Sequence, residues 1–162
     1  MTHYSPFENL ERLEHEQLAR AHRTLDIAMY SFTDLYLAQQ LKDLATRYRV
    51  HVRIYRDREQ FLNEQQAAAR PSPRKALSTT DFLRGTPNIE IRVNSASSRS
   101  IMHLKAYILD QALFRDGSAN WSPAGLKDQD NTLRFTNDPD DLERFQAAFE
   151  SMWKRPDNLK VQ

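Results

Sequence analysis

Apolar and polar residues follow two different periods along this chain, and each change of period marks an expected element. From Phe7 to about Arg23 the apolar positions recur at helical spacing, and Ser5–Glu8 has the order of a capping box with proline at the first helical position. We therefore expect a first helix that begins at Ser5–Glu8. Leu25–Phe32 is nearly continuous in apolar residues, which is typical of a strand buried on both faces of a sheet.

The middle of the chain repeats this alternation of helical and strand patterns. Asp34 can cap a second helix, and Val50–Ile54 alternates apolar with polar residues as a strand does. Asp57–Ala69 has helical propensity but is polar, and it runs into Arg70–Lys75, whose two prolines and three cations exclude a regular element. A short helix is expected near Thr80–Arg84, just before a glycine.

The remainder of the chain is expected to contribute mainly strands. A tight turn at Asp110–Gln111 joins two of them. An early alternation of strands and helices, followed by clustered strands, predicts an α/β fold with a mixed, mostly parallel central sheet flanked by helices on both faces. The expected strands are Ile89–Val93, Met102–Leu109, Ala112–Asp116 and Asn131–Thr136, and the last helix runs from Asp138 to just before Pro156.

The composition predicts one compact domain that spans residues 1–162. With 162 residues, of which 40% are hydrophobic and 28% charged, the chain can bury a core without disulfides or structural metals. Cysteine is absent, which excludes thiol catalysis, redox switching and zinc sites built on cysteine. No apolar run approaches the roughly 20 residues needed to cross a bilayer, so the chain is expected to be soluble, while its compartment stays open.

Charge is nearly balanced overall but uneven along the chain. The formal net charge of +1 does not indicate a nucleic-acid binder in the way that a strongly basic sequence would. Between Arg84 and Arg115, however, five basic residues stand against two acidic ones, so this segment leans positive. The basic run Arg70–Lys75 could also touch a polyanion, although a solvated loop is the commoner explanation for such a run.

The residues with the strongest chemical signal are a histidine and a lysine two positions apart. On the expected strand Met102–Leu109, His103 and Lys105 project from one face, because successive side chains point to opposite faces. Ser118 and Asn120 follow the next strand and add neutral hydrogen-bonding groups. Lysine, serine and asparagine can hold the non-bridging oxygens of a phosphodiester, and a neutral imidazole can attack phosphorus. One histidine cannot act at the same time as nucleophile and as acid.

These residues resemble the motif of the phospholipase D superfamily. His103, Lys105 and Asp110 reproduce its H-x-K-x-x-x-x-D pattern, and Ser118 and Asn120 belong to a Gly-Ser-x-Asn element that follows the motif in the family. Several residue types at fixed spacing are a far more specific signal than a lone histidine beside a lysine.

The resemblance covers most of the chain, from about Asn9 to Phe135. Leu25–Asp34 looks like the first core strand of the family, and Val50–Tyr55 looks like the second. Asp130 stands where many members have glutamate before an asparagine, which keeps the carboxylate but shortens it. The resemblance implies a phospholipase D-like fold and a supporting role for Asp130.

A single copy of the motif implies a homodimer that shares one active site, because short family members complete the site with a second copy. By resemblance, His103 of one subunit forms a phosphohistidine, and His103 of the other serves as general acid and then as base. Lys105, Ser118 and Asn120 would bind the phosphate. Asp110 belongs to the catalytic motif, where the family uses it to orient and pair with neighbouring groups. The resemblance implies no metal and no cofactor.

The motif does not identify the alcohols on either side of the phosphorus, so the substrate stays open. Length, the single motif and Ser31–Thr33 resemble the small bacterial nucleases of the superfamily, which favours a non-specific endonuclease. The first alternative is a phospholipase D-type lipid phosphodiesterase, although no membrane-contacting amphipathic element is evident. The second is a nucleic-acid-binding module of the same fold without turnover, against which the intact His103 and Lys105 argue.

Two further features carry weaker signals. His15 and His22 are seven residues apart on the first expected helix, a spacing that does not suit a metal-binding pair, and the other histidines have no ligand-like spacing either. No metal site is therefore expected. Trp121 follows Asn120 directly and could stack on a base or lie at the subunit boundary, but packing in the core explains it equally well.

Overall fold

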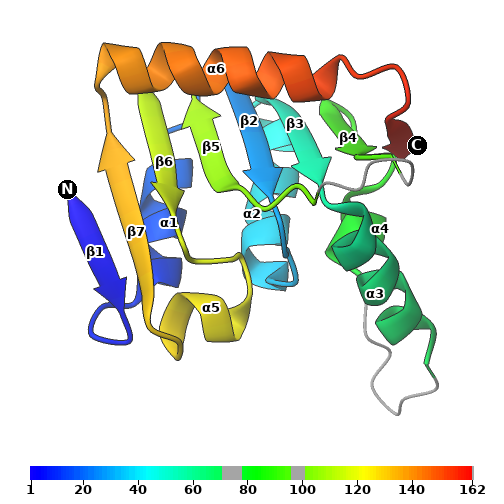
Figure 1. Ribbon diagram of the computed structural model, residues 1–162, viewed down its shortest axis with the longest axis horizontal. Coiled ribbons are helices and arrows are strands. Elements are labelled where there is room, and N and C mark those ends of the chain that lie inside the picture. The colour runs from blue at the N-terminus through cyan, green and yellow to red at the C-terminus, as the bar shows by residue number, and fades with distance from the viewer. Residues whose placement is uncertain (71–77, 96–100, 162) are drawn as a thin grey trace.

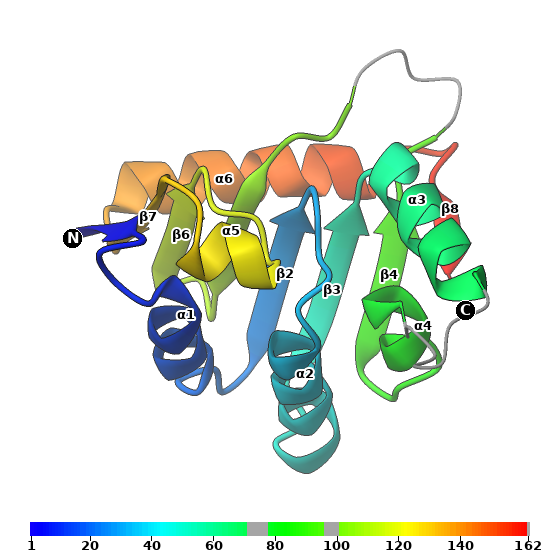
Figure 2. The same cartoon turned by 90° about the horizontal axis from the view of Figure 1, so that it is seen from below.

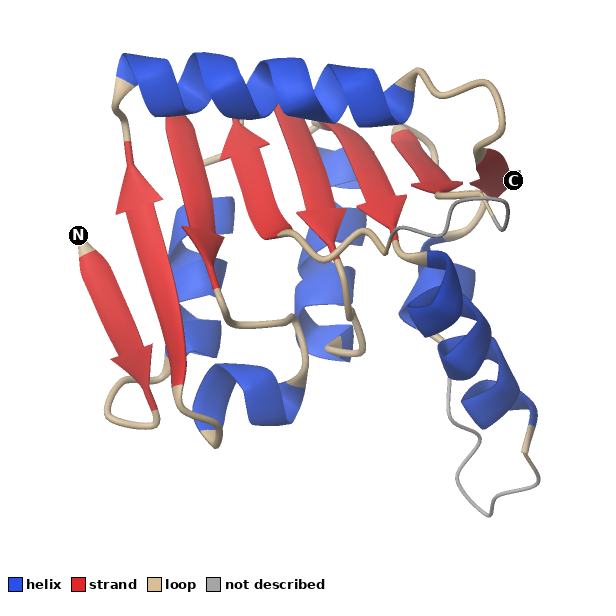
Figure 3. Ribbon diagram, viewed as in Figure 1, coloured by secondary structure: helices blue, strands red, loops and turns tan. Residues whose placement is uncertain are grey.

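The computed structural model describes residues 1–70, 78–95 and 101–161, and their strands form a single 8-stranded sheet in the order β1-β7-β6-β5-β2-β3-β4-β8 (Figures 1 and 3). The strands are β1 (Thr2–Ser5), β2 (Thr24–Met29), β3 (His51–Arg56), β4 (Ile89–Val93), β5 (Lys105–Leu109), β6 (Leu113–Gly117), β7 (Asn131–Thr136) and β8 (Leu159–Val161). The helices are α1 (Leu10–Leu18), α2 (Leu35–Arg47), α3 (Arg58–Ala69), α4 (Thr79–Leu83), α5 (Pro123–Lys127) and α6 (Pro139–Trp153). Most of the basic run Arg70–Lys75 lies outside the described residues.

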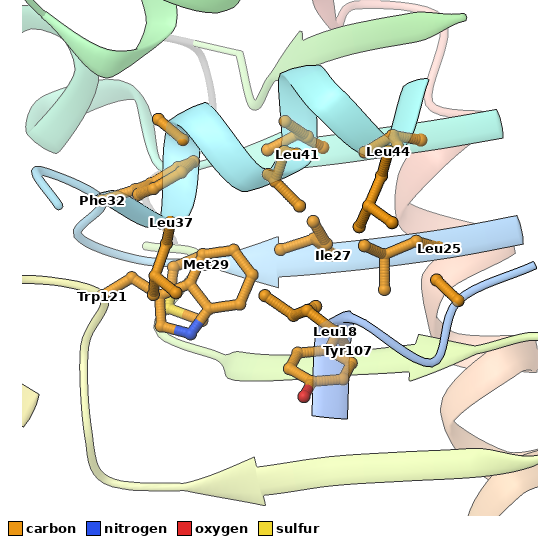
Figure 4. Close-up of a cluster of buried hydrophobic side chains, with 14 of the residues drawn as sticks. Leu18, Leu25, Ile27, Met29, Phe32, Leu37, Leu41, Leu44, Tyr107 and Trp121 are labelled. Carbon is orange, nitrogen blue, oxygen red and sulfur yellow. The ribbon is translucent and has the colours of Figure 1, made fainter. Parts of the chain in front are cut away.

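Helices cover both faces of this sheet, which confirms the predicted α/β layering. Figure 2 shows α6 crossing one face while α1 and α2 lie against the other. Between α6 and the strands lies an apolar cluster that includes Phe149 and Trp153. The opposite cluster is larger, and Trp121 is wholly buried in it beside Phe32 (Figure 4). The core interpretation of Trp121 is therefore confirmed.

The sheet is mixed as predicted, but the expectation that it is mostly parallel is wrong. Among the described strands, only β2 with β3 and β3 with β4 pair in parallel, while the other five pairings are antiparallel. Parallel neighbours need a crossover connection, which only the first half of the chain supplies. After β4, strands β5 and β6 are joined by the tight turn at Asp110–Gln111, whose residues have φ values of 51° and 56°.

The N-terminal segment corrects the predicted capping box. Residues Thr2–Ser5 form strand β1, which pairs antiparallel with β7, and α1 begins only at Leu10. The hydroxyl of Ser5 donates to the carbonyl of Gln129 at 2.6 Å rather than capping a helix. Asn9 takes the capping position instead, because its side-chain oxygen accepts from the backbone N–H of Arg12. Sheet pairing at a distant strand thus overrides the local pattern.

The strand predicted at Met102–Leu109 also begins later than expected, at Lys105. His103 therefore precedes the strand. The next residue, Leu104, is bound to the residue that follows β2, since its carbonyl accepts from the N–H of Tyr30 at 2.9 Å. Leu104, which also precedes the strand, is 41% exposed.

Gly117 ends β6 at a point where a side chain cannot fit. Its φ is +148°, and a Cβ atom there would come within 2.2 Å of the carbonyl oxygen of Thr132. We expect Gly117→Ala to lower the free energy of unfolding by about 3 kcal/mol, measured by urea denaturation. Gly85→Ala is the matched control, because Gly85 has a φ of +70° but nothing within 4 Å of the added atom. Its expected loss is about 1 kcal/mol, and equal losses in the two variants would contradict a steric cause.

Candidate active site

The candidate site lies at one edge of the sheet, where β2 ends and β5 begins. These two strands are antiparallel neighbours with Met29 opposite Lys105, so the residue after β2 lies beside the residues before β5 (Figure 1). Tyr30 and His103 meet at this point, with ring centroids 4.5 Å apart.

His103 and Lys105 are brought together by the ring of Tyr30. The ammonium Nζ of Lys105 lies 4.6 Å from the centroid of that ring and donates to the carbonyl of His103 at 2.8 Å. His103 itself is exposed to solvent, whereas Lys105 is only 8% exposed. Burial disfavours the ammonium form and lowers the pKa of Lys105, and the charge of Arg115 lowers it further. The imidazole and the ammonium therefore both contact the ring of Tyr30, and the ammonium also binds the backbone of His103.

Asn120 reaches the same edge from the loop that follows β6. Its side-chain oxygen accepts from the backbone N–H of Ser31 at 3.3 Å, next to Tyr30. The backbone of Trp121 reinforces this contact, because its N–H donates to the Ser31 carbonyl at 3.1 Å and its carbonyl accepts from Thr33. The loop after β2 and the loop after β6 are therefore joined, and Asn120 lies against the residue that follows Tyr30.

A buried ion pair underlies this surface. Arg115 and Glu14 are both fully buried, and Arg115 Nε donates to Glu14 at 2.6 Å. The same guanidinium donates to the carbonyl of Lys105 and, at 3.0 Å, to the carbonyl of Ala119, the residue before Asn120. Glu14 also accepts from the indole N–H of Trp121 at 3.0 Å. One ion pair therefore ties together the two segments that carry Lys105 and Asn120.

A second buried network holds the loop after β2 from the opposite side. Arg56 is 1% exposed and donates to Glu64 at 2.6 Å and to the carbonyl of Met29 at 3.3 Å. Glu64 accepts in turn from the N–H of Phe32, whose carbonyl accepts from the hydroxyl of Thr79. Burial raises the pKa of Glu64, which the neighbouring Arg56 opposes. Helices α3 and α4 are thus joined to the loop that contains Tyr30.

Ser118 and Asp130 are not linked to His103 by any contact among the described residues. The hydroxyl of Ser118 donates to Asn131 and accepts from the backbone N–H of Thr132, both at 2.9 Å. It therefore closes the connection between β6 and β7. Asp130 is exposed directly before β7, at the start of the same connection. Their predicted phosphate-binding and supporting roles stay predictions.

Asp110 lies at the far end of β5 from His103. It follows Lys105 by five positions along the chain, which corresponds to about 17 Å of extended strand. Its carboxylate accepts from the backbone N–H groups of His22, Arg23 and Thr24, each at 2.8 Å. Burial opposes the charged form, but these three hydrogen bonds outweigh it and lower the pKa of Asp110. A cavity of about 680 Å³ borders Asp110 and His22 at this end, away from the candidate site.

The hydrogen bonds of Asp110 lead to a pH-dependent expectation. We expect Asp110→Asn to lower the free energy of unfolding by about 1–2 kcal/mol at neutral pH, because the amide offers one acceptor oxygen in place of two. The folded pKa of Asp110 is lowered, so its contribution is present above the pKa of the unfolded chain and is lost as pH falls through the folded pKa. Urea denaturation of both proteins at neutral and acidic pH should therefore show their difference shrinking in acid. A constant difference would contradict this account.

Sequence reasoning missed Tyr30, Glu14 and Arg115 as contributors to the site. A signal for Glu14 was present, because it lies four residues from both Leu10 and Leu18 on the buried face of α1. A carboxylate at an apolar position of a helix indicates a buried partner. Tyr30 offered no comparable signal, since its role depends on which strand lies beside β2.

Two properties of the described residues bear on cofactors and membranes. No group of three or more His, Asp or Glu side chains lies close enough together there to hold a metal ion. None of the helices in these ranges is long and apolar enough to cross a bilayer.

Comparison with known proteins assigns the family. Residues 15–153 match the family model described as cardiolipin synthase, PLD-like domain. The chain therefore belongs to this family and to the phospholipase D superfamily of phosphodiesterases, as the motif predicted. Among curated proteins it is 28% identical over 144 residues to a mitochondrial cardiolipin hydrolase of Drosophila melanogaster and 27% identical over 150 residues to that of Danio rerio. These matches cover 86% and 91% of this chain but only 56% and 59% of the relatives, so the chain spans little more than half their length.

Two solved structures share the fold over nearly their whole length. NucT from Helicobacter pylori has a TM-score of 0.78 at 23% identity, with 95% of this chain and 94% of that chain covered. The phospholipase D family member Nuc from Salmonella typhimurium has a TM-score of 0.79 at 20% identity, with 100% and 97% covered. The predicted phospholipase D-like fold is thus confirmed.

Proposed function

We propose that this chain hydrolyses phosphodiesters with His103 as the nucleophile, without a metal, in a site that a second copy of the chain completes. The observation that carries the proposal is the contact of His103 and Lys105 with one aromatic ring, with Asn120 on the adjoining loop. An exposed imidazole beside a partly desolvated ammonium suits attack on an anionic ester, because the cation offsets the charge of the phosphate oxygens.

The proposed reaction has two displacements at phosphorus. A ring nitrogen of His103 bonds to phosphorus while the bond to the leaving oxygen breaks, and the second copy's His103 gives that oxygen its proton. The same second imidazole then takes a proton from water as the water oxygen bonds to phosphorus and the phosphorus–nitrogen bond breaks. Lys105 and the amide group of Asn120 hold the non-bridging oxygens throughout.

The arrangement of histidines supports the dimer. The proposed steps need two imidazoles, and each of the other four histidines lies elsewhere in the fold. Ile101 and Leu104, close to His103 in the chain, are 57% and 41% exposed, so apolar surface adjoins the site for a partner to cover. The remaining histidines are His3 on β1, His15 on α1, His22 beside Asp110 and His51 at the start of β3, opposite the end that adjoins Tyr30.

Nucleic acid is the proposed substrate, but the local positive charge supports it less than the sequence indicated. Arg115 is buried against Glu14, and Arg92 donates to the carbonyl of Trp153 and lies 4.3 Å from the centroid of its ring. What supports the proposal is the resemblance to small bacterial nucleases, together with the fold shared with Nuc and NucT over almost the entire chain.

A lipid phosphodiester is the second candidate substrate. The curated relatives are named cardiolipin hydrolases, and the exposed Ile101 and Leu104 would also suit contact with acyl chains. A non-catalytic nucleic-acid-binding module is the third candidate, and the intact His103 and Lys105 argue against it.

Turnover of a chromogenic phosphodiester in the presence of EDTA tests the proposal. We expect turnover that survives chelation, whereas loss of activity with EDTA and its recovery with a divalent ion would contradict a metal-free mechanism. Plasmid nicking and release of phosphate-containing product from cardiolipin liposomes, run in parallel, separate the two substrate classes. Binding of DNA without turnover of any diester would contradict both enzyme candidates and support the non-catalytic nucleic-acid-binding module.

A further inference from the structure

We propose that Tyr30 is a positioning residue, whose ring aligns the imidazole of His103 with the ammonium of Lys105 and whose hydroxyl is held by Gln60. This inference rests on the proposed function, because it assigns a part in that reaction to a residue outside the motif.

The first support is that a single ring contacts both groups. The imidazole of His103 lies against Tyr30 with centroids 4.5 Å apart and ring planes inclined at 60°. The Lys105 ammonium lies over the same ring at 4.6 Å from its centroid. The backbone N–H of Tyr30 also donates to the carbonyl of Leu104, the residue between the two. Side chain and backbone of Tyr30 therefore both face the motif.

The second support is that His103 lies outside regular structure and needs such a contact. Strand β5 begins only at Lys105, so no strand pairing fixes the backbone of His103 itself. Asp57, which is 1% exposed, accepts from the N–H of Met102 at 3.0 Å with one oxygen and caps α3 with the other through the N–H of Gln60 at 3.1 Å. The start of α3 therefore holds the segment before His103.

The same helix start also holds the Tyr30 ring. The amide Nε2 of Gln60 donates to the hydroxyl of Tyr30 at 3.0 Å. Because Asp57 fixes both Gln60 and Met102, the tyrosine ring and the histidine segment share one support. The ring of Tyr30 and the segment before His103 are thus anchored to the same helix start.

The chemistry of an aromatic face suits this place. The face carries partial negative charge, so it attracts the ammonium of Lys105. The imidazole becomes cationic when it bonds to phosphorus or takes a proton, and the ring contact then strengthens in the same way. Tyr30 is thus expected to favour the charged states through which the reaction passes, rather than the binding of substrate.

Variants of Tyr30 with a matched control test the inference on the chromogenic diester. Tyr30→Leu removes the aromatic face, and we expect kcat to fall about tenfold or more with little change in KM. Tyr30→Phe keeps the face and should recover part of this loss, to about a third of the unaltered kcat. Tyr36→Leu is the control, because Tyr36 is 55% exposed on α2 and stacks on His15, away from the site. Circular dichroism and the melting temperature establish that each variant is folded.

The hydroxyl contact is tested separately, which keeps the inference falsifiable if Tyr30→Leu does not fold. Tyr30→Phe and Gln60→Ala should each lower kcat roughly threefold, and the double variant should lose no more, because both remove one hydrogen bond. Additive losses, or a Tyr30→Leu kcat equal to that of Tyr36→Leu, would overturn the inference. Failure of the proposed function is distinguishable, because the unaltered chain would then show no turnover, or the His103→Ala variant would stay active in the same assay.

Discussion

His103→Ala is expected to lower kcat for phosphodiester hydrolysis by about a thousandfold or more while the chain stays folded. The imidazole is exposed and contacts the Tyr30 ring, so its removal opens no cavity in the core. The loss is expected to be large because, in the proposed mechanism, the variant lacks both the nucleophile and, through the second copy, the acid and base. Steady-state rates on a chromogenic diester measure the effect, and melting temperatures establish that the fold is kept. Near-normal turnover would remove His103 from the mechanism.

Mixed dimers extend this expectation to the shared site. If a site needs both imidazoles, only dimers of two unaltered chains are active. After subunit exchange, an equal mixture of unaltered and His103→Ala chains should therefore have about a quarter of the activity of unaltered protein at the same total chain concentration. Independent sites would retain about half. Analytical ultracentrifugation at the assay concentration supplies the control, since a fully active monomer would contradict the shared site directly.

Arg115→Met is expected to destabilise the chain by about 3–5 kcal/mol, because it leaves the Glu14 carboxylate buried without its partner. Both side chains are wholly buried, so water cannot compensate. Glu14→Leu combined with Arg115→Met should recover much of the stability, since an apolar pair of similar volume replaces a buried ion pair at little cost. Urea denaturation of the single and double variants measures both effects.

The double variant also distinguishes two roles of the ion pair: stabilising the fold, and positioning the segments that carry Lys105 and Asn120. The guanidinium of Arg115 holds the carbonyls of Lys105 and Ala119, so the double variant should fold yet hydrolyse the diester about tenfold more slowly or worse. Arg53, whose ion pairs with Asp26 and Glu150 lie near α6, is a control for charge removal away from the site. A stable double variant with normal kcat would show that the pair serves the fold alone.

Local signals along the chain predicted the starts of α2, α3 and α6. Asp34, Asp57 and Asp138 each accept from a backbone N–H at the start of the helix that follows. Such caps depend on a few neighbouring residues, so the sequence alone reveals them. The turn at Asp110–Gln111 was predictable for the same reason.

Elements formed by distant pairing were not predictable. Strand β1 exists because Thr2–Ser5 pairs with β7, and β8 exists because Leu159–Val161 pairs with β4. Both lie at the edges of the sheet, and neither has a strong pattern of its own. The capping-box pattern at Ser5–Glu8 does not start a helix, because Thr2–Ser5 forms this strand pairing instead.

In the candidate site, too, some residues could be predicted from the local sequence, while others depend on distant pairing. His103, Lys105 and Asn120 were found from residue type and spacing, and the structure gathers them at one edge. The contributions of Tyr30 and Arg115 to the site were not predicted, because their contacts depend on which strands lie beside β2, β5 and β6 in the sheet. The spacing of residues in the sequence indicates which side chains could react or bind substrate. The residues that hold those side chains in place are determined by tertiary packing.

The stereochemical course at phosphorus shows whether His103 bonds to phosphorus during hydrolysis. A diester of known configuration, with sulphur in place of one non-bridging oxygen, is hydrolysed in isotopically labelled water, and the configuration of the thiophosphate product is determined. A phosphohistidine on His103 requires two in-line displacements, each of which inverts phosphorus, so we expect net retention. Net inversion would mean that water attacks the ester in a single step, and it would contradict His103 as the nucleophile.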